Sequence, residues 1–214
     1  MQRLDLPLLL YSITDRKAQG GAEPLLARIA AAARAGVDLI QLREKDLATR
    51  ELEQVAQQAR VAVAGTRAKL LINSRVDVAI ASGLDGVHLT SGPDELPASE
   101  ARVMFAKAGR TAPVIGVSCH TVAEVLVAES HGADFVVFGP VFSKGENAGT
   151  GLESLRAACS ALPNGSTMKV LALGGVEIGN ARDCVRAGAA GVAGIRLFQL
   201  GDVAETVARL RSLG

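Results

Sequence analysis

Short apolar runs alternate along the chain with longer stretches in which apolar residues recur three and four positions apart. The runs are rich in Leu, Val or Ile and are followed by glycine or polar residues, which is typical of strands buried on both faces of a parallel sheet. The pattern predicts eight strands, at residues 6–14, 37–41, 69–73, 86–89, 113–118, 134–138, 169–173 and 191–195.

The intervening stretches carry Ala, Leu, Glu, Arg and Gln with the spacing of amphipathic helices. They predict helices at residues 23–35, 49–64, 75–82, 99–108, 122–131, 152–161, 178–187 and 202–213. With 214 residues shared among eight strand–helix units, each unit has about 27 residues, enough for a strand, a helix and two short loops.

A glycine motif recurs where a predicted helix ends and an apolar run begins. Its glycines, 47, 49 and 56 residues apart, are Gly36, Gly83, Gly132 and Gly188. Glycine suits a helix C-terminus because it accepts the left-handed backbone conformation. Four such marks, one before every second strand, predict a closed eight-strand barrel, whereas a doubly wound open sheet usually has fewer strands and one glycine-rich fingerprint. We therefore expect an α/β fold, a single (βα)8 TIM barrel over residues 1–214.

Composition and charge narrow the classes of function. Aromatic residues make up only 3% of the chain and the formal net charge is +1, which argues against a base-stacking surface and against a field that attracts nucleic acid or anionic membranes. The three cysteines have no CxxC spacing, and no apolar run approaches the length of a membrane span. We expect a cytoplasmic protein with a small-molecule ligand, no nucleic-acid partner and no membrane partner.

In a barrel of this kind the chemistry lies where strands end and the following loops begin. Glycine-containing turns follow the last two predicted strands, at Gly174, Gly175 and Gly194. Glycines let backbone N–H groups approach an anion closely, and Arg196 beside them can add charge-assisted hydrogen bonds. The sequence thus predicts a phosphate site here, although Gly174 and Gly175 could simply form a tight turn.

The alternation of side chains along a strand gives a second set of candidate substrate-binding residues. Gln41, Arg43 and Lys45 point the same way if the second strand continues, and so do Ser118 and His120 at the fifth. Converging cationic and polar groups in the mouth suit an anionic substrate.

Arg43 and Lys45 could instead lie on the solvent-exposed rim of the barrel and contact no substrate. In that arrangement Arg43 and Lys45 pair with Glu44 and Asp46.

The histidines have different expected roles. His120 follows a strand end in a Ser-Cys-His-Thr turn, and its imidazole can take and return a proton near neutral pH. We expect His88 to be a packed, hydrogen-bonded core residue and His131 to be a surface cap at a helix end. Cys119 has the opposite parity to His120, which favours packing over nucleophilic catalysis.

Oxygen ligands for a hard metal ion are sparse. The loop carboxylates Asp15, Asp94 and Glu95 are scattered, so we expect no dedicated metal site and regard Asp94 as a weak candidate ligand.

Six ordered motifs resemble the thiamine phosphate synthase/TenI superfamily over roughly residues 8 to 200. They are QLREKD (41–46), LINSRVD (71–77), GVHL (86–89), IGVSCHT (115–121), FGPVF (138–142) and ALGGV (172–176). The resemblance implies a TIM barrel that acts in thiamine biosynthesis on a phosphorylated thiazole. It also implies that Asn73 and Lys144 contact the substrate and that Ile195 joins the phosphate anchors.

The superfamily contains two chemistries, and the chain departs from the pattern of one. Synthases join a pyrimidine methyl diphosphate to thiazole phosphate with Mg²⁺, and they carry a metal-binding Asp where this chain has Ser74. Asp94 is only an approximate match to their second acidic ligand, the 143–150 loop supplies one Lys, and Arg196 replaces a Ser.

These departures resemble the thiazole tautomerase branch, in which a histidine matching His120 moves a proton on a thiazole phosphate carboxylate. There Gln41, Arg43 and Lys45 face the carboxylate. We therefore put first a thiazole phosphate tautomerase with His120 as general acid and base and no cofactor.

A Mg²⁺-dependent thiamine phosphate synthase is the alternative, in which Asp94 recruits the metal. A non-catalytic sensor of thiazole phosphate or thiamine phosphate comes third. A homodimer is left open.

Overall fold

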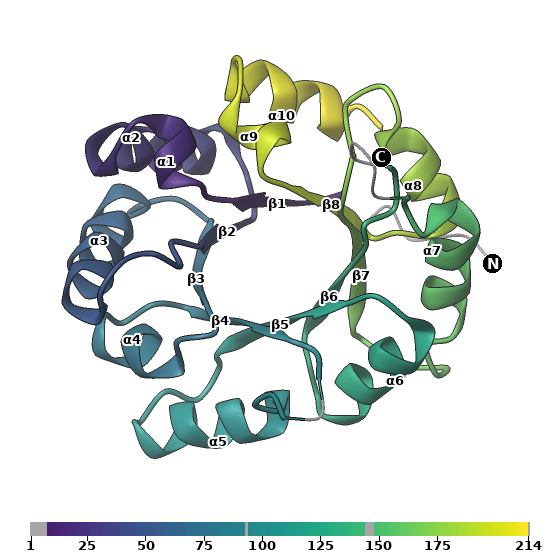
Figure 1. Cartoon of the computed structure of the whole chain (residues 1–214), viewed down its shortest axis with the longest axis horizontal. Coiled ribbons are helices and arrows are strands. Elements are labelled where there is room, and N and C mark those ends of the chain that lie inside the picture. Colours follow the sequence, from purple (N-terminus) through teal and green to yellow (C-terminus); the bar gives the residue numbers. More distant parts are fainter. Residues whose placement is uncertain (1–7, 93, 144–147, 214) are drawn as a thin grey trace.

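The eight strands form one closed ring, as the sequence predicts. The computed structural model describes residues 8–92, 94–143 and 148–213. Neighbouring strands are parallel and follow sequence order, with β1 closing the ring against β8. They are β1 (Leu9–Ile13), β2 (Leu39–Leu42), β3 (Lys69–Asn73), β4 (Gly86–Thr90), β5 (Val114–Cys119), β6 (Phe135–Phe138), β7 (Lys169–Ala172) and β8 (Gly191–Gly194). The (βα)8 barrel is therefore confirmed (Figure 1).

Helices form an outer layer around the strands (Figure 1). They are α1 (Arg16–Gln19), α2 (Ala22–Ala35), α3 (Thr49–Ala62), α4 (Val76–Ala81), α5 (Ala98–Lys107), α6 (Val122–Ser130), α7 (Gly151–Ser160), α8 (Ala181–Ala187), α9 (Arg196–Gln199) and α10 (Val203–Arg211). Among the described residues, no helix is long and apolar enough to cross a membrane.

Strand side chains alternate between two apolar clusters because successive residues point to opposite faces. Residues of one parity fill the barrel interior, for example Tyr11, Leu71, Phe135 and Leu171. Residues of the other parity pack beneath the helices. The inward parity continues to the carboxyl ends of the strands, where it places polar side chains at the barrel mouth.

The glycine marks precede β2, β4, β6 and β8, as predicted. Each takes a positive φ: 98° at Gly36, 67° at Gly83, 74° at Gly132 and 112° at Gly188. His131 is the exposed C-terminal cap of α6, also as predicted.

An aspartate stands two residues after three of these glycines and binds the strand before it. Each carboxylate accepts the N–H of that strand's second residue: Asp38 from Leu10 (2.8 Å), Asp85 from Leu70 (2.9 Å) and Asp134 from Ile115 (2.7 Å). Each also pairs with a cation: Arg211 (2.8 Å), Lys69 (3.1 Å) and Arg102 (3.0 Å) respectively. We call these three groups the aspartate clamps. Ala190 takes the fourth position, before β8.

Several boundaries differ from the predictions. The expected first strand starts at Leu6, but residues 1–7 lie outside the described part of the chain. The helix expected at 178–187 begins at Ala181, because the Asn180 side chain accepts the Glu177 N–H (2.8 Å) and donates to the Gly175 carbonyl (3.0 Å). The four-residue helices α1 and α9 were not predicted, since one turn gives no periodic signal.

Candidate active site at the barrel mouth

Two amide side chains meet at the ends of β2 and β3. Gln41 is buried and points inward, and its Nε2 donates to Asn73 Oδ1 at 3.3 Å. Asn73 Nδ2 donates in turn to Ser74 Oγ at 3.1 Å. Ser74 is exposed and takes a left-handed φ of 58°, and its N–H donates to the His88 carbonyl at 2.8 Å. The structure therefore brings together the predicted residues Gln41 and Asn73.

The predicted convergence of Arg43 and Lys45 holds only in part. β2 ends at Leu42, so parity no longer applies by Lys45, which is exposed in a turn. Arg43 is half-buried and forms no ion pair with another described residue. Burial first, and then the nearby charge of Arg43, lower the pKa of His88 to about 3. The charge of Arg43 therefore acts on the His88 imidazole.

Glu44 is a residue whose role the sequence missed. It is buried, and it accepts the Thr14 hydroxyl at 2.5 Å and the Arg16 N–H at 2.9 Å. Burial raises the pKa of Glu44 although these hydrogen bonds and Arg16 oppose the rise. Asp46 binds Arg16 at 2.6 Å.

The solvated-rim alternative is therefore wrong in its pairing. Glu44 and Asp46 join the loops after β1 and β2 and do not neutralise Arg43 or Lys45.

His120 lies two residues beyond Ser118, and hydrogen bonds orient its ring. His120 Nδ1 lies 2.6 Å from the Gly139 carbonyl oxygen at the end of β6. Since a carbonyl can only accept, Nδ1 carries the proton in this bond, and Nε2 is the nitrogen left for chemistry.

Glu124 supports this turn and was also missed. It accepts the His120 main-chain N–H at 2.6 Å and the Ser91 hydroxyl at 2.8 Å. Burial opposes ionisation, but these bonds bring the pKa of Glu124 below its ordinary value. Thr121 caps α6 by accepting the Glu124 N–H at 3.2 Å. The Thr-x-x-Glu spacing of a capping box was the signal that could have found Glu124.

His88 and Cys119 are core residues, as predicted. His88 is 3% exposed, and its ring bonds Tyr11 on one side and Ser118 on the other. Cys119 is fully buried on the outward parity, and burial, followed by the charge of Glu124, raises the pKa of its thiol to about 12. A thiol with such a pKa is a poor nucleophile at neutral pH.

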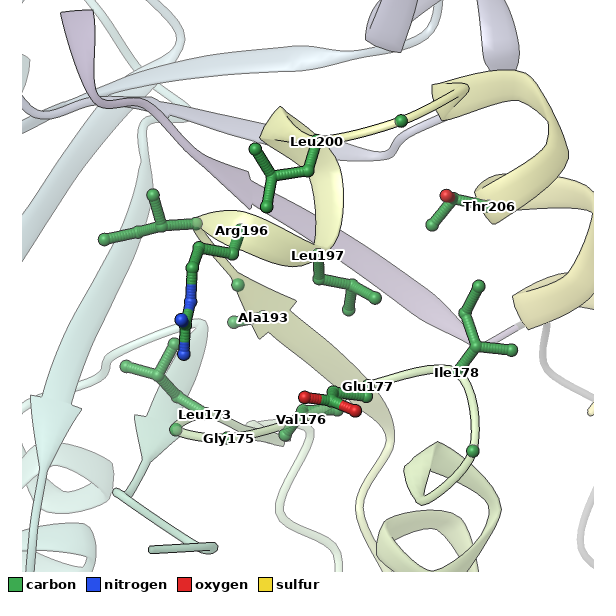
Figure 2. A pocket seen from close by; sticks show the side chains of 15 residues that line it. Leu173, Gly175, Val176, Glu177, Ile178, Ala193, Arg196, Leu197, Leu200 and Thr206 are labelled. Atoms are coloured by element: carbon green, nitrogen blue, oxygen red, sulfur yellow. The ribbon is translucent and has the colours of Figure 1, made fainter. Parts of the chain in front are cut away.

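All of the predicted phosphate residues line one cavity of about 650 Å³ beyond β7 and β8: Gly174, Gly175, Gly194, Ile195 and Arg196. In Figure 2 the Arg196 side chain extends from α9 toward the loop that carries Leu173 and Gly175. Arg196 is exposed and has no ion pair within the described part of the chain.

The two glycines of the β7 turn cannot be replaced without strain. Their φ angles are 93° at Gly174 and 63° at Gly175. A Cβ would lie 2.4 Å from Pro140 Cα at the first and 2.8 Å from Phe142 Cβ at the second. Their N–H groups donate to no acceptor among the described residues. The two glycines do form a tight turn, and that turn leaves both N–H groups without an acceptor among the described residues.

The residues that could hold Mg²⁺ are few. The described residues contain no group of three or more His, Cys, Asp and Glu side chains able to share a metal ion. Asp94 is exposed in the loop after β4, and Ser74 offers a hydroxyl where a carboxylate would bind a hard cation. This donor set does not fit a protein-built magnesium site. Lys144 lies outside the described residues.

Comparisons with known proteins cover nearly the whole chain. Residues 10–198 match the family model described as thiamine monophosphate synthase. A relative from Geobacter sulfurreducens, provisionally named a thiamine-phosphate synthase, is 43% identical over 86% of this chain and 83% of its own. The thiamine-phosphate synthase of Methanoculleus marisnigri is 39% identical over 94% of this chain and 93% of its own.

A solved structure agrees with these matches. The thiamine phosphate pyrophosphorylase from Pyrococcus furiosus superposes with a TM-score of 0.80 at 31% identity, covering 96% of this chain and 95% of that one. Barrel, motifs and relatives lead to one assignment: this chain belongs to the thiamine monophosphate synthase family.

Proposed function

We propose that this chain binds a phosphorylated thiazole at the barrel mouth and uses it in thiamine biosynthesis. The observation that carries the proposal is the cavity after β7 and β8, which is lined by Arg196 and by Gly174 and Gly175, two glycines whose N–H groups have no acceptor among the described residues. Backbone donors and an unpaired guanidinium together suit a phosphate group. The barrel fold commonly holds phosphate at this position.

For the reaction, the names of the relatives favour the transferase over the tautomerase that the sequence analysis put first. A thiamine-phosphate synthase forms a bond between the thiazole ring and the methylene carbon of a pyrimidine diphosphate. The carbon–oxygen bond to the diphosphate breaks, and diphosphate leaves with the electron pair. In this chain Arg43, unpaired among the described residues, is the cation placed to bind anionic oxygens in the mouth.

Magnesium would neutralise the departing diphosphate in such a reaction. Because the described donors offer little to a metal ion, the mechanism assigned to this chain's own residues is restricted to binding and orientation. Gln41 and Asn73 orient the ring from β2 and β3, and the β7 and β8 turns hold its phosphate.

One observation favours the tautomerase as a second candidate. The bond from His120 Nδ1 to the Gly139 carbonyl leaves Nε2 as a base at the end of β5. That nitrogen can take a proton from a thiazole phosphate carboxylate and return it at another atom, with no net change in protons. Such a reaction needs no metal, in keeping with Ser74.

Two assays with and without EDTA distinguish the candidates. In the first, the protein receives thiazole phosphate, hydroxymethylpyrimidine diphosphate and Mg²⁺. We expect thiamine phosphate to form and EDTA to abolish its formation. In the second, it receives the non-aromatic thiazole phosphate carboxylate, and tautomerisation persists in EDTA if His120 acts alone.

The variant His120→Gln refines the result. A tautomerase should lose about 10²–10⁴-fold in rate while its affinity for thiazole phosphate is nearly kept. Binding of thiazole phosphate without turnover in either assay would instead identify the sensor. Absence of thiazole phosphate binding contradicts the proposal as a whole.

A further inference from the structure

A hydrogen-bonded chain of three side chains runs from the barrel interior to the mouth. Tyr11 of β1 is fully buried, and its hydroxyl lies 3.1 Å from His88 Nδ1 of β4. On the other side of the ring, His88 Nε2 lies 2.9 Å from Ser118 Oγ of β5. Ser118 is half-buried and pairs in register with Thr90 near the carboxyl ends of these strands.

Aromatic packing holds the first two members in place. The Tyr11 and Phe135 rings pack edge to face with centroids 5.2 Å apart, and the His88 and Phe135 centroids are 5.8 Å apart. Phe135 fits only because residue 116 is glycine, since a Cβ there would lie 2.2 Å from Phe135 Cζ. The rings therefore have little freedom to exchange partners.

His88 is neutral in this environment. Burial is the larger cause of its low pKa and the charge of Arg43 the smaller. A neutral imidazole has one N–H donor and one acceptor nitrogen, so the proton position on His88 fixes the direction of both hydrogen bonds.

Only one of the two directions gives the Tyr11 hydroxyl proton an acceptor. Within the described part of the chain, the Tyr11 hydroxyl has His88 Nδ1 as its one hydrogen-bond partner. Burial also keeps the phenol protonated by raising its pKa. If Nδ1 carried the proton, the Tyr11 O–H would be a buried donor without an acceptor, which is costly. The Tyr11 O–H therefore donates to Nδ1, and Nε2–H donates to Ser118 Oγ.

We propose that Tyr11 and His88 are positioning residues that make Ser118 a hydrogen-bond donor toward the substrate. Ser118 Oγ accepts from His88, so its own O–H is directed to another acceptor. The mouth thereby selects, at this point, a substrate atom that accepts a hydrogen bond, such as a carboxylate or phosphate oxygen, over one that only donates. The identity of that substrate rests on the proposed function, but the direction of the two hydrogen bonds from Tyr11 to His88 and from His88 to Ser118 does not.

The proton position can be measured without any ligand. The chain has three histidines, so the double variant His120→Gln/His131→Gln leaves His88 as its single imidazole. Long-range ¹H–¹⁵N spectra of the ¹⁵N-labelled variant should show a protonated Nε2 and an unprotonated Nδ1, unchanged between about pH 5 and 8. A protonated Nδ1, or a ring that gains a second proton in this range, overturns the proposal.

The positioning role is tested by a double-mutant cycle with thiazole phosphate as the probe. Tyr11→Phe keeps the ring that packs on Phe135 but releases His88 Nδ1. We expect it to weaken binding by about tenfold, as Ser118→Ala does, and the double variant to lose no more than either single variant. Additive losses would contradict the coupling.

The two experiments fail in different ways. If wild-type protein does not bind thiazole phosphate, the proposed function fails. The ¹⁵N spectra still report the direction of the hydrogen bonds between Tyr11, His88 and Ser118. If Tyr11→Phe does not fold, the spectra of the Tyr11-containing protein decide.

Discussion

Individual polar residues inside this barrel have protonation states set by burial. His88 shows the effect most clearly, because its pKa falls to about 3 with burial as the main cause. An unfolded chain would protonate the same imidazole near pH 6.5. Between these two values the unfolded state binds a proton that the folded state does not, so stability rises with pH across this window and falls on acidification.

The sign and size of this effect can be measured with His88→Gln. From pH 7.5 to pH 5 the wild-type protein should lose about 2 kcal/mol of unfolding free energy through His88 alone. The cost of His88→Gln, large at pH 7.5 because both hydrogen bonds of a buried ring are disturbed, should shrink by the same amount at pH 5. Urea unfolding of both proteins at the two pH values provides the comparison. A cost that does not change with pH would mean that His88 titrates normally in the folded state.

For single residues, the sequence predicted which side chains lie together at the barrel mouth but not which of them form hydrogen bonds or ion pairs with each other. Gln41 and Ser118 were found by inward parity, which persists to the end of a regular strand, and Asn73 was found by the family resemblance. Lys45 was misplaced because β2 ends at Leu42, and parity has no meaning in the turn that follows. Glu44 entered only the alternative of a solvated rim, because the burial of this loop carboxylate depends on Thr14 and Arg16 from a distant segment.

Short elements position the cavity beyond β7 and β8, and the longer helix α2 holds them in place. Arg28 of α2 donates to three main-chain carbonyls around the end of α9: Phe198 at 2.6 Å, Gly201 at 2.8 Å and Leu200 at 2.9 Å. Gln19 of α1 adds a bond to the Gln199 carbonyl at 2.9 Å. Because α9 begins at Arg196, these contacts also position the guanidinium at the cavity.

Arg28→Lys tests this dependence. A lysine keeps the charge but cannot reproduce a planar fork of donors, so α9 should loosen. We expect the dissociation constant for thiazole phosphate to rise about three- to tenfold, with little change in the rate at saturation. Arg34→Lys is the matched control on α2, because the Arg34 side chain bonds no other described residue. Equal affinities for the two variants would show that α9 does not depend on Arg28.

Element type and order were predictable from the sequence, whereas the one-turn elements were not. The eight strands and their parallel order follow from apolar runs and glycine marks spread over the whole chain. Nothing in the periodicity marks α9, whose place is set by contacts with Arg28 and Gln19, which lie 170 and 180 residues away in sequence from their partners Phe198 and Gln199.

In the whole molecule, the aspartate clamps lie at the amino ends of the strands, opposite the mouth. Ala190 occupies the clamp position before β8, and its N–H donates to the Val170 carbonyl as the Asp85 N–H donates to the Leu70 carbonyl. Lys169 begins β7 just as Lys69 begins β3. The fourth position therefore has the backbone and the cation of a clamp but no carboxylate.

Ala190→Asp should complete the fourth clamp. The new carboxylate can accept the Val170 N–H and pair with Lys169, and we expect the unfolding free energy to rise by about 1 kcal/mol. Ala190→Asn keeps the acceptor without the charge and should gain less. Asp85→Ala calibrates an existing clamp and should cost about 1–2 kcal/mol. A loss of stability in Ala190→Asp, measured by chemical denaturation, would refute the equivalence of the four positions.

The clamps also bear on how easily this scaffold can be redesigned. Their carboxylates, cations and backbone partners share no residue with the loops after β2, β3, β5, β7 and β8 that carry the candidate site. Libraries that randomise those loops therefore leave the anchoring of the strands intact, and new specificities can be selected with little risk of losing soluble, folded protein.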